Sequence, residues 1–401
     1  MPKKGTYSLA STASTSQNYR RLKRECQRKK QLFVDMAFPP TNSSLFLDVN
    51  RSSDIVWKRP GELVENPQLF VEGASPNDVT QGILGNCWFV SACSALTHNE
   101  ELLQKVIPCA NAQEWGNNNS YCGIFQFQFW RFGEWFEVIV DDLLPTKDGK
   151  LLFARSKTPN EFWSALLEKA FAKLYGCYEN LVGGQLADAL QDVSGGVAET
   201  INVRKFLSSD GAEGTGLRLF QTLRNAFDQQ ALIVAAIANV PYIQYDFLFQ
   251  NPAFRHQNPA SKILHLANLT RPPTSAKSKE DIEKSLDCGL VKGHAYAVTA
   301  VRYIDLDAKE RRASAHIFPT HERQMMIRLQ NPWGEKEWNG PWSDNSAEWE
   351  QVKEAAMTII ETPSTPPSND QEQTSAAGKL MIIDIQMEEN DLLGVTVDET
   401  W

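Results

Sequence analysis

The chain has 401 residues, a length that predicts two or three domains. Of these residues 42% are hydrophobic and 10% aromatic, a composition typical of a globular protein. This composition excludes a mainly disordered chain, and the net charge of −9 argues against general nucleic-acid binding. The longest apolar run, Ala231 to Val240, is far shorter than the ~20 residues of a membrane span, and no secretory signal is expected. Seven cysteines without CxxC pairs predict neither a disulfide framework nor a zinc finger, so we expect a reducing, cytoplasmic location.

Residues 1–44 are predicted to form a basic N-terminal arm with one short helix. Between residues 1 and 30, nine lysines and arginines stand against a single acid, Glu25. A basic helix of this kind can make transient contact with an anionic membrane or an acidic partner. The simpler interpretation, which we favour, is a solvated helix next to a mobile tail.

Residues 45–200 are predicted to form a first domain that is rich in helices. The apolar positions after Asn86 recur with helical spacing, and those between Trp163 and Leu174 do the same. The predicted elements are a helix beginning near Cys87, a second helix between Asn99 and Pro108, an aromatic hairpin from Ile124 to Val140 that turns at Gly133-Glu134, and an amphipathic helix from Trp163 that stops at Gly176.

Residues 201–355 are predicted to form a second domain of mainly β structure, so that the fold class is α+β. The predicted strands are Ala231 to Val240, Ala295 to Tyr303 and Met325 to Gln330. Residues 241–287 and 305–323 are polar and without a pattern, as expected of surface insertions. Residues 356–401 are predicted to be a divergent linker and tail, in which residues 379–386 alternate weakly like a strand.

Cys87 is the candidate nucleophile. If Asn86 caps the helix, Cys87 lies in its first turn, where the helix dipole and unpaired backbone N–H groups stabilise a thiolate. Gln81, six residues upstream, can supply a side-chain N–H that forms an oxyanion hole with the backbone N–H of Cys87. The alternative interpretation is a buried structural cysteine beside Trp88.

His294 is the candidate general base, because it begins an alternating strand and directly follows a glycine. His98 is excluded, since on a continuous helix it would lie ~16 Å along the axis from Cys87. Asn331 closes the last predicted strand, and its amide can orient the imidazole while Trp333 shields their hydrogen bond from water. The remaining histidines fall in the irregular insertions: His256, His265, His316 and His321.

Three blocks together resemble the active-site segments of calpains, the calcium-activated intracellular cysteine proteases. These blocks are Gln81 to Phe89, Lys292 to Val298 and Asn331 to Gly334. Further resemblance lies in Trp57 to Pro60, Phe129 to Trp135, Val140 to Leu151 and Glu161 to Lys169, so that it covers about residues 18–349. The resemblance implies a papain-like core of two lobes, with Cys87 on a helix of the first lobe and His294 and Asn331 on strands of the second.

The resemblance also implies one calcium ion in each lobe. The first-lobe ligands would be the backbone carbonyls of Val71 and Gly73 and the carboxylates of Asp78 and Glu161, an oxygen set that suits Ca²⁺. In the second lobe Glu337 and Asp344 match, but the acidic loop that completes that site in the family has no counterpart after Met357. The second-lobe site therefore departs from the family pattern.

The predicted function is a calcium-dependent intracellular cysteine endopeptidase that cleaves protein substrates through a thioester acyl-enzyme. One alternative is a catalytically weak or inactive calpain-like scaffold that responds to calcium. A transglutaminase is disfavoured, because that class normally orients its histidine with aspartate rather than with a residue such as Asn331. No EF-hand loop is visible, so we expect any calcium response to arise within the core and no regulatory subunit to bind.

Overall fold

The computed structural model describes most of the two predicted lobes. It covers residues 15–116, 121–203, 206, 215–237, 286, 288–305, 323–334, 338–343, 346–352 and 381–387. Most of the two predicted insertions, including His256, His265, His316 and His321, lies outside the described residues, as do Glu337 and Asp344 and the predicted linker. No helix in the described part of the chain is long and apolar enough to cross a membrane.

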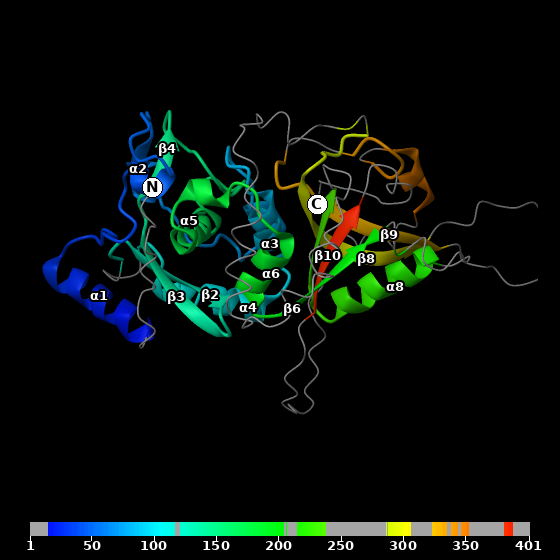
Figure 1. Ribbon diagram of the computed structural model, residues 1–401, viewed down its shortest axis with the longest axis horizontal. Coiled ribbons are helices and arrows are strands. Elements are labelled where there is room, and N and C mark those ends of the chain that lie inside the picture. Colours follow the sequence, from blue (N-terminus) through cyan, green and yellow to red (C-terminus); the bar gives the residue numbers. More distant parts are fainter. Residues whose placement is uncertain are drawn as a thin grey trace, which may run out of the picture.

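The described residues of the first half form six α-helices and two small antiparallel sheets (Figure 1). The helices are α1 (Thr15–Lys29), α2 (Asn42–Leu45), α3 (Cys87–Leu96), α4 (Glu100–Val106), α5 (Trp163–Tyr175) and α6 (Leu186–Ser194). The strands are β1 (Val56–Lys58), β2 (Ile124–Arg131), β3 (Glu134–Asp141), β4 (Leu144–Lys147) and β5 (Lys150–Leu151). Strand order is β1-β4-β5 in one sheet and β2-β3 in the other.

The predicted hairpin is confirmed as β2 and β3. Its two-residue turn falls at Phe132 and Gly133, one residue before the predicted position, and both have positive φ, +53° and +86°. Two positive φ values in a two-residue turn match the right-handed twist of the flanking strands. The alternating residues Phe125, Phe127 and Phe129 are fully buried, so one face of the hairpin closes the core under α5.

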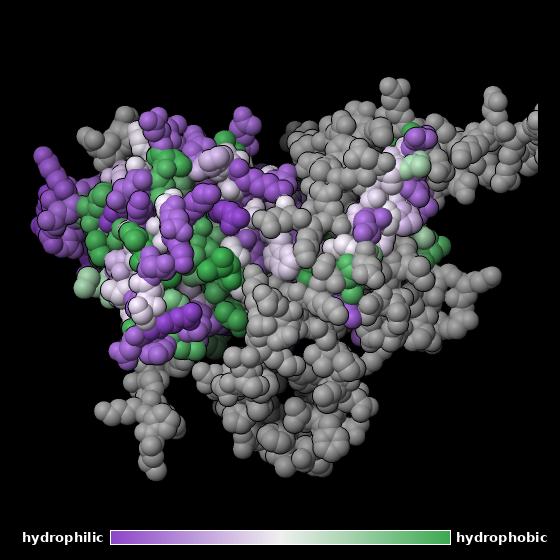
Figure 2. Space-filling model, turned by 90° about the horizontal axis from the view of Figure 1, so that it is seen from above, coloured by the Kyte–Doolittle hydropathy of each residue, from purple (hydrophilic) through white to green (hydrophobic). Residues whose placement is uncertain are grey.

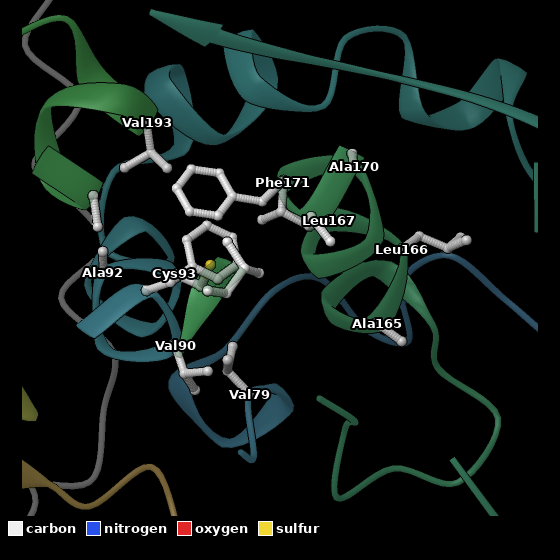
Figure 3. Packing of buried hydrophobic residues seen from close by; sticks show 14 of the residues in the cluster. Val79, Val90, Ala92, Cys93, Ala165, Leu166, Leu167, Ala170, Phe171 and Val193 are labelled. Carbon is white, nitrogen blue, oxygen red and sulfur yellow. The ribbon is translucent and has the colours of Figure 1, made fainter. Parts of the chain in front are cut away.

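Helix α3 is the centre of the first half, and each of its residues is buried. The rings of Phe89 on α3 and Phe171 on α5 stack with centroids 3.9 Å apart. Figure 3 shows the side chain of Phe171 on α5 directed toward α3, where Cys93 lies. Because α3 is buried on all sides, apolar or small residues are required all around the helix, and its sequence contains few polar residues.

The second half is a five-stranded sheet with the order β6-β10-β7-β8-β9 (Figure 1). Its elements are β6 (Val197–Asn202), α8 (Thr215–Asp228), β7 (Leu232–Ile237), β8 (Ala295–Asp305), β9 (Arg323–Gln330) and β10 (Met381–Met387). Together with the helical first half, this sheet confirms the predicted α+β class. The weak strand predicted at residues 379–386 is β10, and it pairs in parallel with both β6 and β7 instead of belonging to a separate tail.

Strand β7 shows why the residues from Ala231 to Ile237 are continuously apolar. Leu232 and Val234 belong to the core around α3, whereas Ile233, Ala235 and Ile237 belong to the core under α8. Successive side chains of a strand point to opposite faces of its sheet, so a sheet covered on both faces requires apolar residues at every position. The sheet therefore packs between α3 and α8, and the two halves share a core.

Buried ion pairs hold the chain after α1 against the first half. Lys169 on α5, fully buried, pairs with Asp141 at the end of β3, and Lys173 pairs with Asp35 at 2.7 Å. The backbone N–H of Asp35 also donates to the second carboxylate oxygen of Asp141, at 2.7 Å. These contacts join β3, α5 and the segment around residue 35 in one buried network.

We expect Lys169→Met to lower the free energy of unfolding by about 3–5 kcal/mol, because it leaves Asp141 buried without its cation. The matched control is Lys147→Met, which removes the exposed partner of Asp54 and is expected to leave stability unchanged within error. Urea unfolding followed by tryptophan fluorescence measures both. Equal effects of the two substitutions would show that the buried pair contributes no more than a surface pair.

Candidate active site

Cys87 is the first residue of α3 and is only 9% exposed. Asn86 occupies the N-cap position, and its backbone carbonyl accepts hydrogen bonds from the N–H groups of Phe89 and Val90, at 2.9 and 3.1 Å. The thiol therefore lies where the partial positive charge of the helix N-terminus favours its deprotonated form.

The side chain of Asn86 does not cap the helix, contrary to the sequence-based expectation. Its Nδ2 instead donates to Oε1 of Glu168 on α5, at 2.7 Å. Glu168 precedes Lys169 within an amphipathic helix, and nothing in the sequence indicates that it faces the start of α3, 82 residues earlier in the chain. For that reason the contact cannot be recognised from the sequence alone.

His294 and Asn331 are brought together at the ends of neighbouring strands. His294 directly precedes β8, Asn331 directly follows β9, and Nε2 of the imidazole lies 2.9 Å from Oδ1 of Asn331. The same Oδ1 accepts the backbone N–H of Trp333 at 3.0 Å. Because that atom accepts from a backbone N–H, Nε2 of His294 is the donor, and Nδ1 is then the basic nitrogen of the neutral ring.

Aromatic rings enclose the His294–Asn331 hydrogen bond. The rings of Trp333 and Tyr296 lie 4.5 and 5.1 Å from the imidazole, centroid to centroid, and His294 is 1% exposed. Exclusion of water lowers the local dielectric constant and strengthens the hydrogen bond that sets the orientation of the ring. The shielding role expected for Trp333 is consistent with this geometry.

Gln81 links the two halves beside these residues. Its backbone N–H donates to the carbonyl of Pro332 at 2.7 Å, so the segment before α3 lies directly against the Asn331–Trp333 turn. Its side-chain Nε2 donates to the carbonyl of Leu84 at 2.5 Å. An amide nitrogen carries two hydrogens, which leaves one for an oxyanion.

Further contacts between the halves lie along α3, and α6 packs against β6 and β10. Helix α3 packs against β7 and β8, and Ser94 Oγ donates to the side chain of Gln330 at 3.0 Å. His98 lies beyond the last residue of α3, away from Cys87, and burial lowers its pKa to about 4, with a smaller contribution from Arg328.

Asp78 and Glu161, two of the predicted calcium ligands, face each other in the first half. Both are buried, and each carboxyl group influences the pKa of the other. Glu161 also accepts the backbone N–H of Val71 at 2.7 Å, and Gly73 follows in the same loop with a φ of +96°. Burial raises the pKa of both carboxyl groups, that of Glu161 to about 7.

This pair has the chemistry of a site for a hard cation. Two facing carboxylates destabilise each other unless a proton or a cation lies between them. In the described residues no group of three or more His, Cys, Asp or Glu side chains converges, so a bound ion would need backbone carbonyls of the Val71–Gly73 loop as further ligands. Glu337 and Asp344, the matching acids of the second predicted site, lie outside the described residues.

The mixed α+β core has the architecture of a cysteine protease core, with the candidate Cys87, His294 and Asn331 near the contact between its halves. Residues 33–366 match the model of the calpain family of cysteine proteases. The chain belongs to this family, as the resemblance in its sequence implied.

Several curated relatives align with most of the chain. Calpain-5 of Caenorhabditis elegans is 61% identical over 346 residues, which are 86% of this chain and 48% of the relative. Calpain-5 of Mus musculus is 44% identical over 346 residues, 86% of this chain and 47% of the relative. The catalytic subunit of calpain-1 from Rattus norvegicus is 40% identical over 341 residues, 84% of this chain and 39% of the relative. The chain thus spans about half or less of the length of these relatives.

The segment before α3 is packed so tightly that Gly82 has no room for a side chain. A Cβ there would lie 2.5 Å from the carbonyl oxygen of Leu152 and closer still to that of Phe153. We expect Gly82→Ala to lower the free energy of unfolding by about 1–3 kcal/mol through overpacking. Gly85→Ala is the control, because its Cβ would meet only Val182 Cγ1 at 3.7 Å. Urea unfolding compares the two, and equal stabilities would contradict the close packing.

Proposed function

We propose that the chain is the protease core of a calcium-dependent cysteine endopeptidase that acts on protein substrates. The observation that carries the proposal is the imidazole of His294, which is oriented by Asn331 and covered by Trp333 beside the segment that leads to Cys87. A buried, oriented histidine next to a cysteine at a helix N-terminus is the arrangement that nucleophilic catalysis by a thiolate requires.

In the proposed mechanism His294 takes the proton of the Cys87 thiol, and the thiolate attacks the scissile carbonyl carbon. The oxyanion that forms accepts hydrogen bonds from the backbone N–H of Cys87 and from Nε2 of Gln81. Protonated His294 then gives its proton to the leaving amine as the C–N bond breaks, which leaves a thioester. Water, deprotonated by His294, attacks the thioester and releases the acid product, and Asn331 holds the imidazole throughout.

We expect Cys87→Ser to reduce hydrolysis of denatured casein at least about 1,000-fold, because a serine hydroxyl here lacks the acidity of the thiol. The control is Cys109→Ser at an exposed thiol outside the site. Casein cleavage on gels measures activity, and circular dichroism verifies that the fold is intact. Undiminished cleavage by Cys87→Ser would disprove the assignment. Failure of Cys87 in the wild-type chain to react with iodoacetamide, with or without Ca²⁺, would favour a non-catalytic scaffold.

The calcium part of the proposal rests on the Asp78–Glu161 pair and its link to the catalytic residues. Asp78 closes a short 3₁₀ turn, Pro76–Asp78, and the carbonyl of Pro76 accepts a hydrogen bond from Gln330 at 2.9 Å. Gln330 directly precedes Asn331. A cation held by the pair would offset the two negative charges and stabilise this turn, which contacts the second half next to the catalytic asparagine.

We expect Asp78→Asn to weaken calcium binding by more than about 10-fold. Substituting a residue that only hydrogen-bonds to a metal ligand already lowers metal affinity by about 10-fold or more, and Asp78 is a proposed ligand itself. Asp148→Asn is the control, because Asp148 is an exposed acid in the β4–β5 turn. The rise in melting temperature on addition of Ca²⁺ measures binding to each variant without requiring activity. A full calcium response in Asp78→Asn would remove the first-lobe site from the proposal.

The proposed setting is the cytoplasm, with α1 as a solvated basic helix that can make transient contact with anionic membranes. All seven cysteines are free thiols, which suits a reducing compartment. Tyr19 fixes α1 against the hairpin, and Arg20, Arg24 and Arg28 follow one another along its exposed side. Figure 2 shows hydrophilic side chains at the left end of the molecule, which α1 occupies in Figure 1. The single acid of the helix, Glu25, is already paired with Lys29.

We expect the triple substitution of Arg20, Arg24 and Arg28 to Glu to abolish co-sedimentation with phosphatidylserine vesicles, because each basic residue near such a surface contributes about 1 kcal/mol. The control reverses three exposed cations elsewhere, Arg51, Lys105 and Lys150. Absence of wild-type binding to these vesicles at low salt, or equal loss in both variants, would contradict a membrane role for α1.

A further inference from the structure

Glu168 is a carboxyl group in the middle of α5 that the proposed mechanism does not use. It is 1% exposed, and in the described part of the chain it forms no ion pair, whereas the adjacent Lys169 pairs with Asp141. Burial raises the pKa of Glu168 to about 7. Burying a carboxyl group without a cation costs free energy unless the group is hydrogen-bonded, so its role depends on its hydrogen-bond partners.

The first of its oxygens holds the start of the nucleophile helix. Oε1 accepts the hydrogen bond from Nδ2 of Asn86 at 2.7 Å, and Asn86 is completely buried. The backbone carbonyl of Asn86 accepts the first hydrogen bonds of α3, and its own N–H donates to the carbonyl of Leu84. The position of Asn86 thus determines where the backbone N–H of the next residue, Cys87, points.

The second oxygen holds the backbone that supports the oxyanion loop, by which we mean residues 80–86. Oε2 accepts the backbone N–H of Ala154 at 2.8 Å. The neighbours of Ala154 pair with the loop, since Arg155 and Thr80 exchange two backbone hydrogen bonds and the N–H of Ile83 donates to Leu152. One carboxyl group therefore fixes the oxyanion loop at its end and through residues 152–155, which hydrogen-bond to it.

We propose that Glu168 is a positioning residue that holds the oxyanion loop and the N-terminus of α3 in the geometry needed for transition-state stabilisation. The inference rests on the proposed protease function. The two oxyanion donors, Nε2 of Gln81 and the N–H of Cys87, belong to the two ends of the segment that Glu168 fixes. A displacement of about 1 Å in such groups can cost 10²-fold in rate even when substrate binding persists.

The hydrogen-bond chemistry separates this role from a need for negative charge. In Glu168→Gln the amide oxygen accepts from Ala154, and the amide nitrogen donates to Oδ1 of Asn86 once that side chain turns over. Oδ1 of Asn86 accepts no hydrogen bond in the described structure, so turning it over costs no existing contact there. Glu168→Leu is similar in volume but accepts neither hydrogen bond.

The experiment compares kcat and KM for a fluorogenic peptide at saturating Ca²⁺ with the rate of Cys87 alkylation by iodoacetamide. We expect Glu168→Gln to keep kcat within about 3-fold of the wild type and Glu168→Leu to lower kcat about 100-fold, with KM changed less than about 3-fold. Ser164→Ala is the control, a buried polar residue on the same helix that has no hydrogen bond to the oxyanion loop. It is expected to match the wild type in both assays.

Asn86→Ser provides a second route to the same contact if Glu168→Leu fails to fold at the assay temperature. Serine keeps a good N-cap residue but removes the amide that reaches Glu168. We expect the same loss in kcat, and a double variant with Glu168→Gln that loses no more than Asn86→Ser alone. Wild-type kcat in Asn86→Ser or in folded Glu168→Leu, or a loss in Glu168→Gln as large as in Glu168→Leu, would overturn the inference.

The two proposals fail in different ways. If the wild-type chain hydrolyses nothing, the protease function fails, and the alkylation rate of Cys87 still reports whether Glu168 positions α3. In that case slower alkylation in Asn86→Ser and Glu168→Leu, but not in Glu168→Gln, would support the positioning role. Equal alkylation rates in all variants would overturn it.

Discussion

The complete burial of α3 is the constraint on which the rest of the structure depends. Helices α5 and α6 and strands β7 and β8 pack around it, and none of its residues is more than 9% exposed. A helix buried in this way cannot leave the polar groups at its start to water, so their partners must come from the protein. The backbone carbonyl of Asn86 accepts the N–H groups of Phe89 and Val90, and a rigid setting for Cys87 is the consequence.

The same burial determines how the core deals with acidic side chains. Asp141 is neutralised by Lys169, and Glu168 is satisfied by two N–H donors without any cation. Asp78 and Glu161 instead face each other, an arrangement that is favourable only with a shared proton or a bound cation. Within one core, Asp141 thus belongs to a structural ion pair, Glu168 is the proposed positioning residue, and Asp78 with Glu161 is the candidate metal site.

The long, locally patterned elements followed from the sequence. The helices at Cys87 and Trp163, the helix capped by Asn99 and the aromatic hairpin all have a period that reflects burial of one face or more. Helices α6 and α8 were not predicted, although Leu186, Leu190 and Val193 carry a helical period in α6. The short strands β1, β4 and β5 were missed for a different reason, since two to four residues are too few to establish a period.

By itself the sequence determined the helix that begins at Cys87, the strand end that carries His294, and the family resemblance that grouped them with Asn331. Only the tertiary structure decided which atoms meet: Nε2 of His294 with Asn331, the N–H of Gln81 with Pro332, and Asn86 with Glu168 instead of with its own helix. The physical reason is that the spacing of apolar residues, which indicates helices and strands, is a local property of the chain. A hydrogen bond instead requires a distance of about 3 Å between two groups that only the fold brings together.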